Sequence, residues 1–199
     1  MNKIKKWGRR NAIAIGLVIL FSVIFLASQR VENILLYYGT TGIQYLGGEY
    51  YRFFTCLFLH YDLGHLLANS AALLSVSSLL TPFLRNRQMV FLFLSGGILS
   101  EIAYSVIISE QIYDIGASSG IFALIACLLV CHLRFPKRLH PVCYRSDGII
   151  VLVYFVFANT SVSAFLVHTF GFAAGILISF VMVSIGRIAV HAPADDCPQ

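Results

Sequence analysis

One serine and one distant histidine have the residue types and the setting of a nucleophile and its base. Ser118 lies in the segment G-A-S-S-G at residues 116–120, and His168 begins the segment H-T-F-G at residues 168–171. Each lies near the start of an apolar run. A serine hydroxyl is a weak nucleophile at neutral pH until an adjacent base accepts its proton. The two residues therefore predict acyl-transfer chemistry, provided that the apolar runs bring them together.

Two further residues have the spacing of paired hydrogen-bond donors. His65 and Asn69 are four positions apart, so they share one face of a helix. Both side chains can donate hydrogen bonds to a developing oxyanion. Gly171 and Gly175 follow the candidate base on one helical face. We expect these glycines to let the helix of the base approach the helix of the nucleophile closely.

The composition indicates where these residues must meet. Of the 199 residues, 58% are hydrophobic and 12% are charged, whereas a soluble domain has about 25% charged residues. A bilayer core about 30 Å thick needs about 20 apolar residues of helix. Tyrosine favours the membrane–water interface, which suits a tyrosine-rich segment at 29–62. We predict an all-α membrane protein in which that segment is a long interfacial first loop of a six-transmembrane-helix bundle, with spans near 11–28, 64–83, 89–108, 118–133, 148–162 and 165–186.

The lysines and arginines predict the orientation of the spans. Threading six helices from a cytoplasmic N-terminus leaves only Arg30 and Arg52 on the outer side. The cytoplasmic segments then hold the other 12 basic residues: Lys3, Lys5, Lys6, Arg9, Arg10, Arg85, Arg87, Arg134, Lys137, Arg138, Arg145 and Arg187. Cytoplasmic loops carry such an excess of positive charge. Both termini are therefore predicted to be cytoplasmic, and the net charge of +5 is no argument for nucleic-acid binding.

This topology brings the polar residues to one depth. The second, fourth and sixth helices all begin on the non-cytoplasmic side. His65 and Asn69 fall in the first turns of the second helix, Ser118 opens the fourth, and His168 lies one turn into the sixth. Helix N-termini carry partial positive charge, which favours the negative charge of a tetrahedral acyl intermediate. Such an arrangement suits peptide-bond hydrolysis within a membrane.

Three motifs, in this order, resemble the rhomboid intramembrane serine proteases. They are Y-R-x-x-T-x-x-F-x-H-x-x-x-x-H-x-x-x-N at 51–69, G-A-S at 116–118, and H-x-x-G-x-x-x-G at 168–175. The resemblance covers roughly residues 48–180. It implies a six-helix bundle with a dyad of Ser118 as nucleophile and His168 as base, without a third acid. It also implies an oxyanion hole formed by His65, Asn69 and the backbone N–H of Ser118.

The resemblance implies roles for supporting residues as well. Phe122, one turn after the nucleophile, falls where the family often has an aromatic ring packed against the catalytic histidine. Arg52 and His60 fall at positions that organise the first loop. The tight turn at Gly116 lets backbone approach the site closely, since glycine has no Cβ.

Several residues admit a second interpretation. Ser119 stands where the family more often has glycine, and it is the alternative nucleophile. Gly116-x-x-x-Gly120, taken alone, is also typical of helix packing in membranes. Glu101, within the third predicted span, is either a structural carboxyl or a group that holds water near the site. The segment 81–85 lacks the acidic residue that many relatives carry there, which affects the expected cytoplasmic loop and not the dyad.

The expected organisation is a single membrane domain at 11–187, between a basic cytoplasmic N-terminus at 1–10 and a cytoplasmic tail at 188–199. We expect no metal and no organic cofactor, because the sequence shows neither H-E-x-x-H nor a nucleotide-binding loop, and its five cysteines lack metal-like spacing. The expected partners are transmembrane protein substrates and the lipid bilayer, not nucleic acid. A multi-pass protein of the bacterial plasma (inner) membrane is predicted. The natural substrate, its cleavage site and the oligomeric state are left open.

Two other classes of protein compete with this interpretation. A non-catalytic member of the same fold would bind membrane helices and escort or retain them, but such proteins usually lack the serine or the histidine. A small transporter or channel would show polar positions through several spans, whereas here they cluster near one face.

Overall fold

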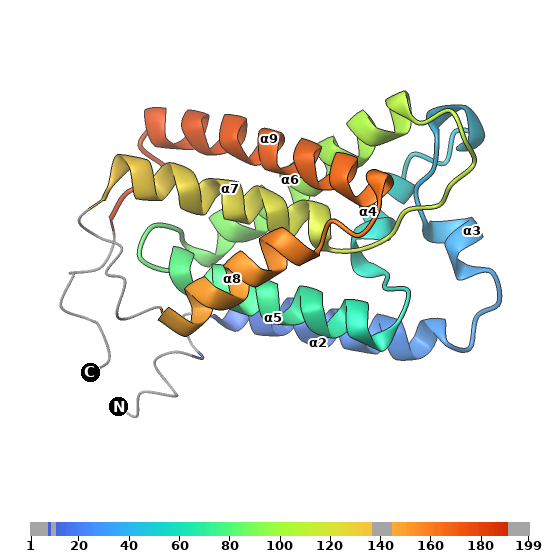
Figure 1. Ribbon diagram of the computed structural model, residues 1–199, viewed down its shortest axis with the longest axis horizontal. Coiled ribbons are helices and arrows are strands. Elements are labelled where there is room, and N and C mark those ends of the chain that lie inside the picture. Colours follow the sequence, from blue (N-terminus) through green and yellow to red (C-terminus); the bar gives the residue numbers. More distant parts are fainter. Residues whose placement is uncertain (1–7, 9–10, 137–144, 191–199) are drawn as a thin grey trace.

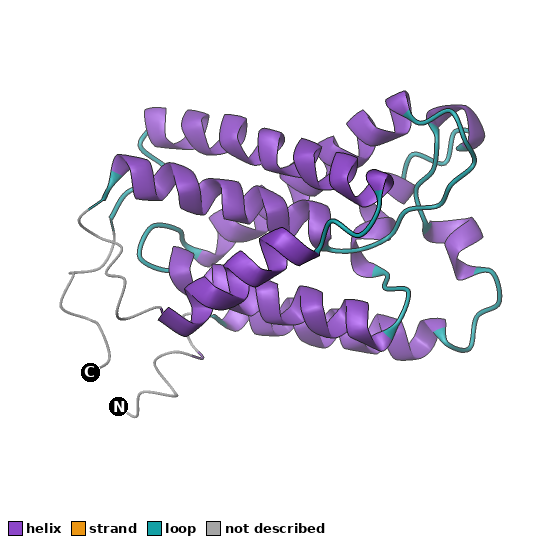
Figure 2. Cartoon of the chain, viewed as in Figure 1, coloured by secondary structure: helices purple, strands orange, loops and turns teal. Residues whose placement is uncertain are grey.

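The computed structural model describes residues 8, 11–136 and 145–190, and this part of the chain is helical (Figures 1 and 2). Its main body is a bundle of apolar helices: α2 (Ala12–Ser28), α5 (Leu63–Leu80), α6 (Asn86–Ile107), α7 (Ser118–Arg134), α8 (Arg145–Phe157) and α9 (Val162–Ser184). Helices α5, α7 and α9 begin at the right-hand end of Figure 1, and α2, α6 and α8 begin at the left-hand end. The first turns of α5, α7 and α9 therefore lie at the same end of the bundle.

Three of these helices are long and apolar enough to cross a membrane. They are α5, α6 and α9, with 18, 22 and 23 residues. The other three apolar helices are shorter, with 17 residues in α2 and α7 and 13 in α8. Their lengths and apolar character are typical of a multi-pass membrane protein.

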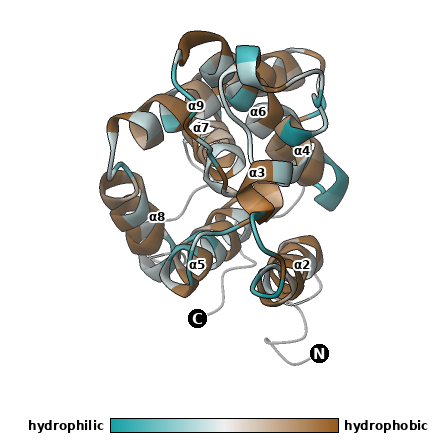
Figure 3. Ribbon diagram, turned by 90° about the vertical axis from the view of Figure 1, so that its right-hand side faces the viewer, coloured by the Kyte–Doolittle hydropathy of each residue, from teal (hydrophilic) through white to brown (hydrophobic). Residues whose placement is uncertain are grey.

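Large apolar side chains cover much of the outer surface of the bundle. Exposed examples are Val23 on α2, Phe157 on α8 and Phe180 on α9, at 58%, 73% and 67%. Figure 3 shows hydrophobic residues on the outward faces of these helices. A soluble protein rarely exposes so continuous an apolar surface, so these faces are suited to contact with lipid.

Helix α7 lies at the centre of the packing, with its most extensive contacts against α9 and α6. A Cβ added to Gly171 or Gly175 of α9 would come closer than 3.0 Å to the carbonyl oxygen of Ser119 or Ala123 on α7. The two backbones are therefore in direct contact, which only small residues allow. Gly120 packs in the same way against the Phe93 ring of α6. It acts as the helix-packing glycine that its spacing indicated.

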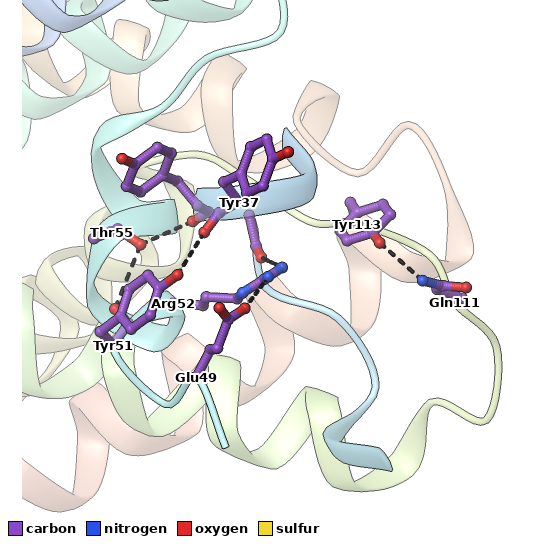
Figure 4. Close-up of polar contacts among 9 residues, drawn as sticks. Tyr37, Glu49, Tyr51, Arg52, Thr55, Gln111 and Tyr113 are labelled. Carbon is purple, nitrogen blue, oxygen red and sulfur yellow. Dashed lines mark hydrogen bonds and ion pairs between the residues drawn. The ribbon is translucent and has the colours of Figure 1, made fainter. Parts of the chain in front are cut away.

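The segment between α2 and α5 forms a structured loop rather than a simple linker. Tyr51 donates a hydrogen bond to the Tyr37 carbonyl (3.0 Å), and Thr55 donates one to the Tyr38 carbonyl (2.9 Å) (Figure 4). These tyrosines are exposed, as expected for an interfacial loop. The loop contains the short helices α3 (Ile34–Tyr38), η1 (Ile43–Tyr45), α4 (Arg52–Thr55) and η2 (Cys56–Phe58).

The helix boundaries follow the predicted apolar runs to within three residues, except at the end of the fifth run. That run was expected to continue to residue 162, but α8 ends at Phe157 and a turn follows. Ser161 then caps α9, because its hydroxyl accepts a hydrogen bond from the Ala164 N–H (3.1 Å). Asn159 and Ser161 are polar residues within the expected apolar run, and residues of these types favour turns and helix caps. The tail at 191–199 and all of the basic segment 1–10 except Gly8 lie outside the described residues.

The contact between α7 and α9 predicts a selective effect of alanine. Gly175→Ala is expected to lower stability by about 1–3 kcal/mol, because the new methyl group forces the two backbones apart. Gly148→Ala on α8 is the matched control, since its methyl group would enter open space and alanine favours helix by up to about 1 kcal/mol. Thermal unfolding in detergent micelles measures both. Unfolding of Gly175→Ala at or above the wild-type temperature would contradict the contact.

Candidate active site

The turn at Gly116 brings Ser118 beside His65. Gly116 has φ +140°, a conformation that residues with a Cβ rarely adopt, and its N–H donates to the Cys56 carbonyl (2.9 Å). A Cβ at Gly116 would lie 2.9 Å from Nε2 of His65 and 3.6 Å from Oγ of Ser118. The hydroxyl and the imidazole therefore flank the same point. Helix α7 begins at Ser118 directly after this turn.

His168 lies over the first turns of α7. Its ring stacks on Phe122, with the centroids 4.2 Å apart and the planes 5° from parallel. Next to it, the Ser100 hydroxyl of α6 donates to the Val167 carbonyl (2.6 Å), which ties α9 to α6 at this level. His168 itself is buried. The structure thus places Phe122 against the candidate base, one helical turn from Ser118.

The two adjacent serines have different surroundings. Ser118 retains slight exposure and lies beside His65. Ser119 is fully buried, and its hydroxyl lies near the Glu101 carboxyl of α6 without a hydrogen bond of good geometry. Within the described chain, Ser118 makes no hydrogen bond to His168. Catalytic hydrogen bonds are often long before substrate binds, so this does not count against the pair.

Asn69 presents an unpaired donor in the same region. Its Oδ1 accepts a hydrogen bond from the Tyr154 hydroxyl of α8 (2.5 Å). Its Nδ2 is buried and has no hydrogen-bond partner among the described residues. The Tyr154 ring also contacts Phe122, at 5.8 Å between centroids. Tyr154 therefore connects Asn69 to Phe122, on which the His168 ring is stacked. The amide nitrogen of Asn69 is free to donate to a ligand.

The two predicted loop-organising residues make different contacts. Arg52 is buried, forms an ion pair with Glu49, and donates to the Gly39 carbonyl at 3.5 Å (Figure 4). It thereby joins two parts of the first loop. His60 is also buried, and its ring packs against Phe21 of α2 (5.3 Å) and against His65 (5.1 Å).

Capping residues set where the functional helices begin. Asp62 accepts a hydrogen bond from the His65 N–H (2.8 Å) and so caps α5. Tyr61 stacks on the His65 ring at 5.8 Å and donates to the Tyr113 carbonyl (2.6 Å). These contacts hold the first turn of α5 against the segment that leads to Gly116.

Sequence reasoning missed two side chains at this site, Tyr154 and Asn159. Asn159 lies in the turn after α8, and its Oδ1 is 2.8 Å from Nδ1 of His168. Tyr154 is far in sequence from its partner Asn69, and Asn159 and His168 are not spaced as neighbours on one helix face. The one signal in the sequence was the group of polar residues that interrupts the fifth apolar run at Asn159. In the described ranges, no group of three or more His, Cys, Asp or Glu side chains is placed to hold a metal ion.

Together, the geometry offers a hydroxyl, two imidazoles and an unpaired amide in the first two turns of three helices. His168 lies nearly two turns into α9, not one as expected, because α9 already begins at Val162. Comparison with known proteins identifies the family. Residues 47–185 match the Rhomboid domain, and the chain belongs to the rhomboid family. It is similar to the Bacillus subtilis (strain 168) protein named "Putative rhomboid protease YdcA", with 29% identity over 140 residues, which is 68% of this chain and 69% of that protein. All three motifs lie inside the matched domain.

The environment of His60 predicts a dependence of stability on pH. Burial, with a smaller effect of the nearby His65, lowers the pKa of His60 from 6.5 to about 4. The unfolded chain then binds more protons than the folded one between these values. The contribution of His60 is therefore complete above pH 6.5 and is lost as the pH falls toward 4. It amounts to at most about 3 kcal/mol, at about 1.36 kcal/mol per pKa unit.

His60→Phe keeps a ring at this position and removes the titration. The variant is expected to lose less stability than the wild type when thermal unfolding is compared at pH 7 and pH 4.5. His132→Asn, at an exposed position of α7, is the control and should follow the wild type. Identical losses in the wild type and His60→Phe would refute the assignment.

Proposed function

We propose that the protein is an intramembrane serine endopeptidase that hydrolyses peptide bonds in or near transmembrane segments of other membrane proteins. The observation that carries the proposal is the position of Ser118 beside His65, with His168 stacked on Phe122 one turn further along the same helix. Membership of the rhomboid family supports it. The name of the Bacillus subtilis relative points to the same class of reaction.

In the proposed reaction, His168 accepts the proton of Ser118 as the hydroxyl oxygen attacks the scissile carbonyl carbon. The carbonyl oxygen takes the negative charge. It accepts hydrogen bonds from His65, the Asn69 amide and the backbone N–H of Ser118. His168 then gives its proton to the leaving amine, and an acyl-enzyme remains. A water molecule, deprotonated by His168, attacks the acyl carbon. The bond to Oγ of Ser118 then breaks, His168 returns the proton to this oxygen, and the new carboxyl group leaves.

The same proposal includes a topology. The helices of residues 11–187 form one domain that crosses the bacterial plasma membrane six times with both termini in the cytoplasm. The site then opens toward the outer side, from which water reaches the acyl-enzyme. A helical substrate hides its carbonyls in backbone hydrogen bonds, so it must unwind locally before it is cut. The short helix α8, with 13 residues, is the proposed side of substrate entry.

The non-catalytic alternative is less well supported by the geometry. A helix-binding protein of this fold needs neither an imidazole stacked on Phe122 nor a buried, unpaired amide donor, and both are present here. The transporter or channel alternative is less well supported too, because the candidate site residues His65, Ser118 and His168 lie in the first two turns of α5, α7 and α9.

Single substitutions test the dyad. Purified protein in liposomes, mixed with a single-span model substrate, is expected to cleave it. Ser118→Ala and His168→Ala should each reduce the cleavage rate by at least about 10³-fold, because each removes a member of the reacting pair. Ser119→Ala, which alters a hydroxyl facing α6, is the matched control and should retain most activity. A fluorophosphonate probe should label the wild type and Ser119→Ala at residue 118.

Two results would change the proposal. Cleavage and labelling that survive Ser118→Ala and are lost in Ser119→Ala would move the nucleophile to Ser119. Cleavage that survives all three substitutions, with no fluorophosphonate labelling of the wild type, would exclude a serine protease.

The Tyr154–Asn69 hydrogen bond predicts a further effect on turnover. Tyr154→Phe leaves Asn69 Oδ1 without its donor, so the amide loses its fixed orientation. We expect kcat to fall about 10-fold with little change in KM, less than the roughly 10²–10³-fold loss for removal of a whole oxyanion donor. Tyr50→Phe, in the exposed part of the first loop, is the control. Unchanged kcat in Tyr154→Phe would show that the amide is oriented by other groups.

A further inference from the structure

We propose that Asn159 is a positioning residue for His168, so that the reacting pair is the end of a Ser118–His168–Asn159 array. This inference rests on the proposed function. It concerns the turn between α8 and α9, which none of the motifs of the rhomboid resemblance includes. The side-chain amide of Asn159 makes the two hydrogen bonds that support this role.

The Asn159 amide bridges the last turn of α8 and the imidazole on α9. Its Nδ2 donates to the Phe155 carbonyl (3.1 Å), and its Oδ1 lies 2.8 Å from Nδ1 of His168. A backbone carbonyl can only accept a hydrogen bond. The nitrogen of the amide must therefore face Phe155, which leaves the oxygen facing the imidazole.

This orientation determines the tautomer of His168. An amide oxygen can only accept, so Nδ1 of the imidazole must carry the proton that it shares with Asn159. In the neutral ring Nε2 is then unprotonated. Nε2 is the ring atom that a serine hydroxyl needs as its proton acceptor. Asn159 thus prepares the imidazole to act as a base toward Ser118.

The other contacts of His168 leave this task to Asn159. One face of the ring is stacked on Phe122, which fixes the plane but not the rotation of the imidazole within it. His65 on α5 is a titratable group near His168. In the ranges 11–136 and 145–190, Asn159 is the hydrogen-bond partner of the His168 side chain. The stacking and the amide together define one orientation of the ring.

A neutral partner suits the apolar setting. A carboxylate at this depth would have to be stripped of water, which is costly inside a membrane protein. An amide orients an imidazole without adding charge, as in the Cys-His-Asn arrangement of papain-like proteases. Because the same amide is bound to Phe155, the orientation of the base also depends on the position of α8.

Two substitutions at one position separate catalysis from structure. Asn159→Ala removes both hydrogen bonds. Asn159→Asp keeps an oxygen acceptor for Nδ1 of His168 and loses the donor to Phe155. Thr160→Ala, at the exposed neighbouring position, is the matched control. The full-length protein in detergent micelles is reacted with a fluorophosphonate probe from pH 5 to pH 9, the rate of labelling at Ser118 is measured, and thermal unfolding is recorded for each variant.

We expect Asn159→Ala to label about 10- to 100-fold more slowly than the wild type, since an imidazole without its partner samples the wrong tautomer and rotation. Asn159→Asp should label within a few-fold of the wild-type rate. The acidic limb of its labelling rate against pH should move to higher pH, because a carboxylate favours the protonated imidazole of His168. Thr160→Ala should match the wild type in rate and profile.

Two results would overturn the proposal. One is an Asn159→Ala variant with the wild-type rate and pH profile. The other is an equal loss of labelling and of unfolding temperature in Asn159→Ala and Asn159→Asp, which would assign Asn159 a structural role at the end of α8. Failure of the proposed function is distinguishable, because the wild type itself would then not be labelled at Ser118.

Discussion

The site depends on the direct contact between the backbones of α7 and α9. Gly171 and Gly175 have no Cβ, so α9 lies against the carbonyl groups of Ser119 and Ala123. Any larger residue would separate the two helices. At this short separation the imidazole of His168 reaches the first turns of α7 and stacks on Phe122. The contact thus brings the imidazole of α9 to the helix that begins at Ser118.

Neutral hydrogen bonds, not charges, orient the polar groups of this region. Tyr154 holds the Asn69 amide, and Asn159 holds the His168 imidazole. Both partners come from α8 and the turn that follows it. In an apolar bundle an amide or phenol costs far less to bury than an ion, and its directional hydrogen bonds still fix a side chain. The one buried arginine of the first loop, Arg52, is paired with Glu49 outside the bundle core.

Much of the fold was predictable, because long apolar runs and the polar segments that separate them are local properties of the sequence. The helices α2, α5, α6, α7 and α9 lie close to the predicted spans. The fifth span was expected to continue to residue 162, but α8 ends at Phe157, because the polar residues that follow it form a turn at Asn159 and a cap at Ser161. The contents of the first loop were not predicted either. Its stability comes from hydrogen bonds between residues such as Tyr51 and Tyr37, which no periodicity encodes.

The sequence by itself determined the class of the protein, the helical composition of the bundle and the residue types able to react, because hydropathy and motif spacing act along the chain. Only the tertiary structure decided which polar groups meet. It separated Ser118, beside His65, from Ser119, which faces α6. It also supplied Tyr154 and Asn159 as partners of Asn69 and His168. Those pairings depend on the distance between packed helices and on the orientation of buried amide groups. Neither of these can be read from a short segment of sequence.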